Sequence, residues 1–389
     1  MHADPVVFTI FLIFTGAAAL ATLALYARQS MLVAYIVLGM LLGPSGAGLV
    51  EDAEMTRQVA QIGIMFLLFL LGLDLYPQKL IGLFRETVVV TGVSSAVFAG
   101  VGFALGWVLG FATMECLIIG VALMFSSTII GLKLLPTTVL HHRHTGEIII
   151  SVLLLQDLIA IIVLLLLQAS DQRGMPLVDI LLVLLSLPAL VLVAWLVERF
   201  VVMTLVRRFD KIHEYIFLLA IGWCLGLAQL AESVGLSYEI GAFIAGVLLA
   251  TSPIALYIAD SLKPLRDFFL VIFFFTLGAR FDVAILMEVL LPASLLAGLV
   301  LTLKPLTFRF LLRRSGEASG RSREVGVRLG QISEFSLLIA VLALEQRIIG
   351  HQASYLIQVA ALLTFMVSSY VIVMRYPTPI AISDKLRRD

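Results

Sequence analysis

The chain has few charged residues for its length. Of its 389 residues, 13% are charged and 61% are hydrophobic, whereas a water-soluble domain of this size has about twice that share of charge. Its repeated apolar runs of about 20 residues are long enough to span a bilayer as helices. Alternating segments of roughly ten residues, typical of outer-membrane barrels, do not occur in the sequence. The composition therefore predicts an all-α, polytopic membrane protein.

Cysteine, net charge and catalytic motifs are also scarce. The two cysteines, Cys116 and Cys224, both lie in apolar segments, so they indicate neither a disulfide framework nor a metal site. The formal net charge is zero, which gives no reason to expect nucleic acid as a partner. Neither a G-x-S-x-G nor an H-E-x-x-H motif is present. The sequence therefore does not predict an enzyme.

The apolar runs predict thirteen membrane spans. They lie at 6–26, 31–43, 59–75, 87–109, 115–133, 148–168, 176–198, 213–231, 238–251, 266–279, 283–312, 326–345 and 353–374. With the N-terminus outside, the expected cytoplasmic loops hold 21 of the 26 Lys and Arg residues and the outer loops hold four, as the positive-inside rule requires. We expect residues 1–389 to form one transmembrane transport domain in membrane lipid, without a soluble domain. The membrane is expected to be a bacterial-type cytoplasmic (inner) membrane, with the C-terminus on the cytoplasmic side.

A carboxylate stands near the middle of the sixth span. Asp157 follows Gln156 inside the apolar run Ile148–Leu167. A charge at the bilayer centre costs roughly 3 kcal/mol or more, and Asp157 is too deep for its short side chain to reach the interface. Its carboxylate must therefore be neutralised by a proton or by a monovalent cation before it crosses the hydrophobic barrier. The two compete for one residue, which predicts exchange of a cation for a proton.

Two other spans carry polar interruptions. These are Ser126, Ser127 and Thr128 in the fifth span, and Gly330, Gln331, Ser333 and Glu334 in the twelfth. Polar side chains of this kind satisfy the backbone of a broken membrane helix and can bind a cation. Spans five and twelve are seven positions apart, so they run in opposite directions. This pattern predicts two inverted repeats whose broken helices cross near the midplane.

The polar residues of these three spans and one lysine form the predicted ion site. Asp157 binds the proton or the monovalent cation in turn, and no other metal is expected. Lys304, in the segment LLAGLVLTLKPLTF, balances charge. The remaining predicted ligands or orienting groups are Gln156, Ser126, Ser127, Thr128, Gln331 and Glu334.

Structural roles for the same residues stay open at this point. Hydroxyls in membrane helices often bond to their own backbone. Glu334 can pair with an arginine such as Arg328, and Lys304 can extend toward the cytoplasmic side because its span ends nearby. Glu239 is a weaker additional candidate at the outer mouth.

Eight segments, taken in order, match a known family. They are GMLLGPSGAGLV (39–50), IGIMFLLFLLGLDL (62–75), FSSTIIG (125–131), LLLQDLIAI (153–161), GAFIAGVLLA (241–250), LKPLRDFFLVIFFFTLGARFD (262–282), LTLKPL (301–306) and GQISEFSLL (330–338). Through them the chain resembles the cation:proton antiporter-2 family over nearly its whole length, most closely the Kef-type potassium/proton branch. The resemblance implies the elevator fold of sodium/proton antiporters, with scaffold helices, a mobile core and a homodimer.

The resemblance also assigns roles within the site. Asp157 aligns with the family's core aspartate and Lys304 with its midmembrane lysine. Sodium/proton relatives have a second acid where this chain has Gln156, so the partner of Lys304 is left open. Kef-type proteins usually continue into a cytoplasmic nucleotide-binding domain, whereas this chain ends at Asp389. The resemblance therefore leaves three expectations open: that the rest was removed, that regulation is absent, or that a separate subunit provides it.

The expected function is electroneutral exchange of K+ for H+, with no cofactor beyond the transported ions. A Na+/H+ antiporter of the same fold and a sodium-coupled symporter of organic solutes are the alternatives. A cation channel fits less well, because the polar residues cluster at the middle of the spans between apolar flanks.

Overall fold

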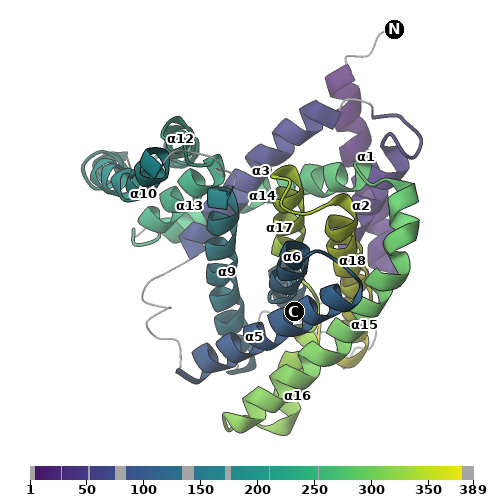
Figure 1. Cartoon of the computed structure of the whole chain (residues 1–389). Coiled ribbons are helices and arrows are strands. Elements are labelled where there is room, and N and C mark those ends of the chain that lie inside the picture. Colours follow the sequence, from purple (N-terminus) through teal and green to yellow (C-terminus); the bar gives the residue numbers. More distant parts are fainter. Residues whose placement is uncertain are drawn as a thin grey trace. The chain divides into compact units, whose positions relative to one another are not determined.

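The structure is a computed structural model that describes residues 5–27, 29–50, 53–74, 85–133, 144–170, 177–209, 211–252 and 254–378. The regular elements of these residues are helices (Figure 1). By length and composition, seven helices are able to cross a membrane, and four shorter helices are also apolar. These findings fit a multi-pass membrane protein, while the count of thirteen spans stays a prediction.

The chain forms two compact units. The first unit contains Met1–Phe14, Leu38–Gly82 and Gln168–Arg280, and the second contains Thr15–Val37, Leu83–Leu167 and Phe281–Asp389. Two of the boundaries between units fall inside the first two helices, α1 (Pro5–Tyr26) and α2 (Met31–Leu42), and a third falls near the end of α9 (His144–Ser170).

The first unit is built around α3 (Ala53–Asp74). Its other elements are α10 (Leu177–Val197), η1 (Glu198–Val202), α11 (Met203–Phe209), α12 (His213–Ser233), α13 (Tyr238–Leu249) and α14 (Ala255–Ala279). Helix α3 packs on α13 and α14. A Cβ atom added at Gly72 would lie 2.6 Å from the Phe243 carbonyl oxygen, so the glycine allows this close helix contact.

One predicted span of the first unit was too short. The tenth was expected at 266–279, but α14 begins at Ala255. Its first half is polar and carries an exposed ion pair between Lys263 and Asp260, 2.6 Å apart. A hydropathy criterion detects only the apolar half of such a helix.

The second unit contains two similar series of elements, each a long helix, a broken helix and a second long helix. The first series is α5 (Arg85–Val108), α6 (Thr113–Leu123) with α7 (Thr128–Lys133), and α9 (His144–Ser170). The second series is α15 (Val283–Arg314), α16 (Ser319–Arg328) with α17 (Glu334–Glu345), and α18 (His351–Arg375). Helix α5 packs on α6, α15 packs on α16 and α18, and α17 packs on both α18 and α6 (Figure 1).

Both predicted helix interruptions are present. The first separates α6 from α7 at residues 124–127, and the second separates α16 from α17 at residues 329–333; we call them the first and second breaks. Between the predicted spans at 283–312 and 326–345, where the sequence predicts no helix, α16 begins at Ser319. This short, polar helix has no apolar periodicity from which the sequence could predict it.

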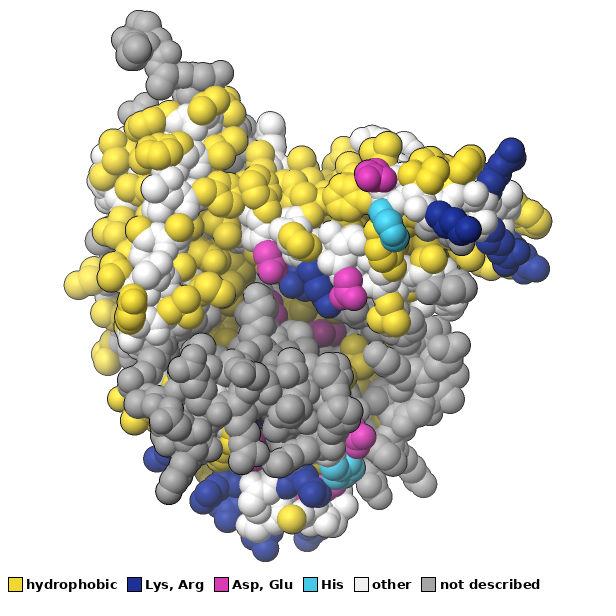
Figure 2. Space-filling view, turned by 180° about the vertical axis from the view of Figure 1, so that it is seen from behind, with side chains coloured by type: hydrophobic (Ala, Val, Ile, Leu, Met, Phe, Trp, Pro, Cys, Tyr) yellow, Lys and Arg dark blue, Asp and Glu magenta, His cyan; other side chains and the backbone are white. Residues whose placement is uncertain are grey.

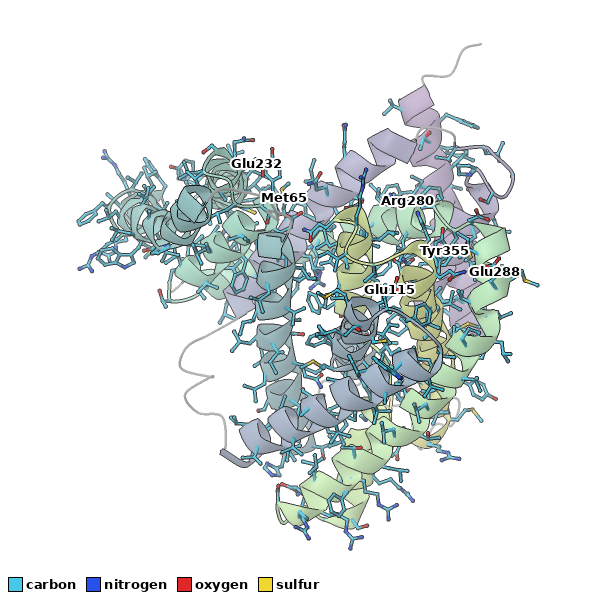
Figure 3. The ribbon with its side chains drawn as sticks, in the orientation of Figure 1. Met65, Glu115, Glu232, Arg280, Glu288 and Tyr355 are labelled. Carbon is cyan, nitrogen blue, oxygen red and sulfur yellow. The ribbon has the colours of Figure 1, made fainter. Side chains whose placement is uncertain are left out.

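The ends of the core helices are held by polar contacts to neighbouring backbone groups. Figure 3 labels two of these side chains, Glu115 and Tyr355. The Glu115 carboxylate accepts hydrogen bonds from the Ala112 N–H (3.1 Å) and the Gly350 N–H (2.9 Å), which joins the start of α6 to the start of α18. The Tyr355 hydroxyl accepts a hydrogen bond from the Asp282 N–H at 2.9 Å.

The described surface is largely apolar. Figure 2 shows hydrophobic side chains over much of one face, and exposed examples include Phe11, Leu166, Phe200 and Leu291. Exposed apolar side chains spread along several long helices are what a lipid environment favours.

Candidate functional site

The first break is held by a side chain from α9. The Nε2 atom of Gln156 donates to the Met124 carbonyl (3.0 Å), and its Oε1 atom accepts from the Ser126 N–H (2.9 Å). Gln156 is fully buried. Both ends of its amide are thus bound to backbone groups that the interrupted helix leaves without helical partners. A carboxylate at this position lacks the N–H needed to reach the Met124 carbonyl.

The two serines of the first break also have structural contacts. The Ser126 hydroxyl donates to the Leu329 carbonyl of the second break at 2.9 Å. The Ser127 hydroxyl accepts from the Ile130 N–H at 3.2 Å, which is the N-cap interaction for the first turn of α7. Their predicted role as cation ligands is not tested by these contacts, but each hydroxyl already supports the backbone.

The second break is held by α18. The Thr364 hydroxyl accepts from the Ile332 N–H at 3.1 Å, and the Ser368 hydroxyl donates to Oε1 of Gln331 at 3.0 Å. Nε2 of Gln331 points to the Ser127 carbonyl of the first break, 3.4 Å away. Ser333 caps α17 by accepting from the Phe335 N–H at 3.1 Å.

Sequence reasoning missed the hydroxyls of α18. The available signal was a set of five polar residues in the interior of an apolar helix, between its polar ends. Two pairs of them are four residues apart, so that each pair shares a helix face. They are Ser354, Gln358, Thr364, Ser368 and Ser369.

Lys304 lies between the two breaks, and its side chain is 1% exposed. Its ammonium nitrogen is 2.6 Å from the Phe125 carbonyl, 3.0 Å from the Gln331 carbonyl and 3.4 Å from the Ser126 hydroxyl. The three N–H donors of an ammonium thus have three acceptors. It also lies 5.2 Å from the centre of the Phe98 ring, in cation–π range.

Sodium/proton relatives have a second acid at the position of Gln156, whereas the partners of Lys304 in this chain are backbone carbonyls. Backbone carbonyls near the C-terminal ends of α6 and α16 carry partial negative charge. One carbonyl from each break faces the ammonium, so Lys304 neutralises both helix ends. The alternative in which Lys304 extends to the cytoplasmic side is wrong, because its nitrogen is buried among these groups.

Close backbone contact brings α16 to α15 at Lys304. A Cβ atom added at Gly326 would lie 2.6 Å from the Pro305 carbonyl oxygen, and one at Gly330 would lie 3.0 Å from Cγ of Pro305. A larger residue at Gly326 would push α16 away from the lysine.

A serine also joins the two broken helices. The Ser336 hydroxyl donates to the Ala122 carbonyl at 2.5 Å, which joins α17 to the last turn of α6.

Asp157 is 4% exposed and adjoins Gln156 on α9. The Thr128 hydroxyl oxygen, at the start of α7, is buried and has no hydrogen-bond partner among the described residues. Glu334 is buried in the first turn of α17, where a helix N-terminus favours a carboxylate. Asp157, Thr128 and Glu334 thus place two buried carboxylates and one buried hydroxyl oxygen in the elements that carry or adjoin the two breaks.

Two further sequence expectations can be placed. Arg328 pairs with Glu324, with Nε 3.0 Å from the carboxylate, and donates to the Pro377 carbonyl at 2.9 Å. The pairing of Arg328 with Glu334 considered from the sequence stays a prediction. Glu239 is buried in the first turn of α13, in the first unit.

Comparison with known proteins agrees with this architecture. The family model described as sodium/hydrogen exchanger, transmembrane, matches residues 10–374. The chain is 27% identical over 348 residues to the iron transporter MagA of Paramagnetospirillum magneticum, covering 88% of this chain and 79% of MagA. It is 29% identical over 385 residues to the putative cation/proton antiporter YbaL of Escherichia coli, covering 94% and 68% of the two chains.

A glutathione-regulated potassium-efflux system protein, KefC of Klebsiella pneumoniae, is 32% identical over 334 residues. The alignment covers 84% of this chain and 54% of KefC, so the chain spans about half the length of that relative. Among solved structures, the sodium proton antiporter MjNhaP1 of Methanocaldococcus jannaschii matches with a TM-score of 0.70 at 16% identity, over 94% of this chain and 95% of that one. The fold is that of a sodium/proton antiporter, and the chain belongs to the sodium/hydrogen exchanger transmembrane family of transporters.

Proposed function

We propose that this protein exchanges K+ for H+, one for one, with Asp157 as the residue that carries each ion in turn. The supporting observation is a buried carboxylate, Asp157, directly beside the side chain that holds the first break. The Gln156 amide and the Lys304 ammonium are both committed to backbone groups of the breaks. Asp157 is the buried carboxylate next to them, and a buried carboxylate is stable only when it is neutralised.

Charge counting supports electroneutral exchange. Gln156 cannot bind a proton at any relevant pH, and each of the three N–H groups of the Lys304 ammonium has an acceptor, so the proposal assigns proton binding during the cycle to Asp157. Asp157 then crosses the membrane neutral as the acid or as the cation pair. A cycle that moved one net charge would feel about 2.3 kcal/mol per 100 mV, whereas this one would not.

The preference for K+ rests on the resemblance of Gln156-Asp157 to the Kef branch and on the KefC relatives, which are named for potassium efflux. Na+/H+ exchange by the same site is the main alternative. Iron belongs in the test because MagA is named an iron transporter, and organic solutes belong there because a sodium-coupled symporter shares the broken-helix design.

The motion and assembly are proposed on the same basis. Both breaks and Asp157 lie in the second compact unit, which fits a mobile core of the elevator type with the ion site inside it. A homodimer, a cytoplasmic (inner) membrane location and a separate regulatory subunit or nucleotide-binding domain are further expectations. Mass measurement in mild detergent and again in lipid nanodiscs tests the dimer, which a monomer in both would contradict.

The central test uses purified protein in proteoliposomes that contain a pH-sensitive dye. We expect a K+ gradient to drive proton movement, with smaller responses to Na+ and Li+ and none to choline, Fe2+ or a panel of organic solutes. Currents recorded from the same protein on a solid-supported membrane should show no net charge movement. A larger response to Na+ would assign Na+/H+ exchange, solute uptake would assign a symporter, and a steady current would contradict the one-for-one cycle.

A further inference from the structure

The hydroxyl of Ser368 differs from most hydroxyls in membrane helices. Such groups usually donate to a carbonyl of their own helix, as Thr364 does to Ala361 at 2.8 Å. Ser368 instead donates across to another helix segment, to Oε1 of Gln331 at 3.0 Å. Both side chains are buried, so water does not compete for this bond.

This bond fixes the direction of the Gln331 amide. With its oxygen held by Ser368, the amide presents Nε2 to the Ser127 carbonyl, 3.4 Å away. That carbonyl also accepts the Gly131 N–H at 3.0 Å, the first helical bond of α7. Both of its lone pairs are therefore engaged, and it presents none to a cation.

Gln331 thereby joins three parts of the core. Its side chain connects α18 to the first break, and its backbone carbonyl accepts from Lys304 at 3.0 Å. Thr128, whose hydroxyl oxygen is buried without a hydrogen-bond partner in the described part of the chain, directly follows the first break at the start of α7. The first break is also bound to Gln156, beside Asp157. A change in the direction of the Gln331 amide is thus transmitted to the segment that borders the carboxylate.

We infer that Ser368 is a positioning residue for the cation site. Through Gln331 it holds the first break in the geometry that binds the cation, and so it sets the apparent cation affinity without itself touching the ion. This inference deepens the proposed exchange function and rests on it. It assigns a functional part to α18, a helix in which the sequence reasoning placed no site residue.

Neighbouring Ser369 provides a matched control. It is equally buried, and its hydroxyl has no hydrogen-bond partner among the described residues. Replacing either serine by alanine removes the same atom from the same helix, but only Ser368→Ala removes the bond to Gln331. Ser368→Thr keeps the hydroxyl and serves as the conservative rescue.

The test measures cation-driven proton exchange in proteoliposomes over a range of K+ concentrations and pH values. We expect Ser368→Ala to raise the KM for K+ by about fivefold, the equivalent of one hydrogen bond, and to shift the pH of half-maximal exchange, with the maximal rate nearly unchanged. Ser368→Thr should restore KM, and Ser369→Ala should match the wild type. An unchanged KM in Ser368→Ala, or an equal rise in Ser369→Ala, would overturn the inference.

A second readout separates this inference from the function on which it rests. Ligand binding raises the melting temperature of a purified protein, so K+ titration of the melting temperature reports cation binding whether or not protons move. If the wild type binds K+ but exchanges no protons, the proposed function fails. The inference about Ser368 is still tested by the same titration: it holds if Ser368→Ala shifts the K+ midpoint and Ser369→Ala does not, and it fails otherwise. If Ser368→Ala does not fold, Ser368→Cys, a weak donor of similar size, should give an intermediate midpoint, and a wild-type midpoint would contradict the assignment.

Discussion

The two breaks solve the same problem with different side chains. In the first, the third helix of the series, α9, supplies the Gln156 amide, which binds both a carbonyl and an N–H of the interrupted backbone. In the second, the third helix of the series, α18, supplies hydroxyls, with Thr364 on the Ile332 N–H. Lys304 donates a hydrogen bond to one backbone carbonyl of each break.

The difference between the breaks lies in what stands next to the supporting side chain. Gln156 is followed directly by Asp157, so the group that holds the first break and the group expected to carry the ion are adjacent on α9. Thr364 and Ser368 have no carboxylate beside them on α18. We therefore expect the first break to respond to neutralisation of the aspartate, and the second break with α18 to form the more constant part of the core.

The largest effect should come from the carboxylate itself. Asp157→Asn removes the charge that a proton or cation must neutralise, and we expect loss of exchange by at least about a hundredfold. Folding should be retained, because the neutral amide avoids the cost of burying a charge. Proton flux in proteoliposomes and the melting temperature measure the two outcomes, and exchange at a normal rate would exclude Asp157 as the carrier.

Removal of the Lys304 ammonium, which binds a carbonyl of each break, should have the next largest effect, mainly on the stability of the fold. Lys304→Met leaves the carbonyls of Phe125 and Gln331 buried without their donor, at a cost of about 3 kcal/mol. Lys304→Gln can still donate to one of them and should lose less. Thermal unfolding in detergent gives the comparison. Normal stability combined with lost exchange would instead make Lys304 part of the ion cycle.

Gln156→Leu tests the support of the first break. It removes the partners of the Met124 carbonyl and the Ser126 N–H, two buried groups, for about 2 kcal/mol in all. Because the break borders Asp157, the rate of exchange should fall as well. A variant as stable as the wild type would show that the first break keeps its shape without the amide.

Thr364→Val tests the second break with a side chain of the same shape. One buried N–H, that of Ile332, loses its acceptor, so we expect about 1 kcal/mol of destabilisation. The maximal exchange rate should change less than in Gln156→Leu. If Thr364→Val reduced exchange more than Gln156→Leu did, the view of the second break as the constant part would be wrong.

The smallest effect on stability should come from the ion pairs of Glu317, just before α16. Glu317 lies 2.6 Å from Arg321 and 2.8 Å from His144, which also contacts Glu147. Burial raises the pKa of the Glu317 carboxyl, but hydrogen bonds from Arg321 and His144 outweigh burial and hold the pKa below its ordinary value of 4.5.

A carboxyl with a lowered pKa stabilises the folded state above its unfolded pKa and loses that contribution as the pH falls. Glu317→Gln should therefore lower stability by about 0.5 kcal/mol at neutral pH, as expected of a partly exposed ion pair. The difference from the wild type should shrink as the pH drops below 4.5. Melting curves at pH 7 and pH 4 measure it, and a difference that grew on acidification would contradict the assignment.

Much of the architecture could be predicted from the sequence, because the lipid environment leaves few alternatives. Apolar runs of membrane length must be helices, and Ser126-Ser127-Thr128 and Gly330–Glu334 marked both breaks to within a few residues. The sequence did not predict the first half of α14 or the start of α16, because these segments contain charged residues and form no continuous apolar run. The family could also be identified from the sequence, because the eight matching segments are short stretches that can be recognised without the tertiary structure.

What the sequence could not decide was which polar side chains support the backbone and which are left for an ion. A broken helix leaves N–H and C=O groups that must find partners, and those partners come from whichever helices fold against the break. Gln156 and Ser126 look like ligands in the sequence, yet their contacts are to backbone groups 30 and 203 residues away. Composition determined that this chain crosses a membrane with a carboxylate in its interior, whereas only tertiary packing decided that Lys304 faces two carbonyls and that α18 holds the second break.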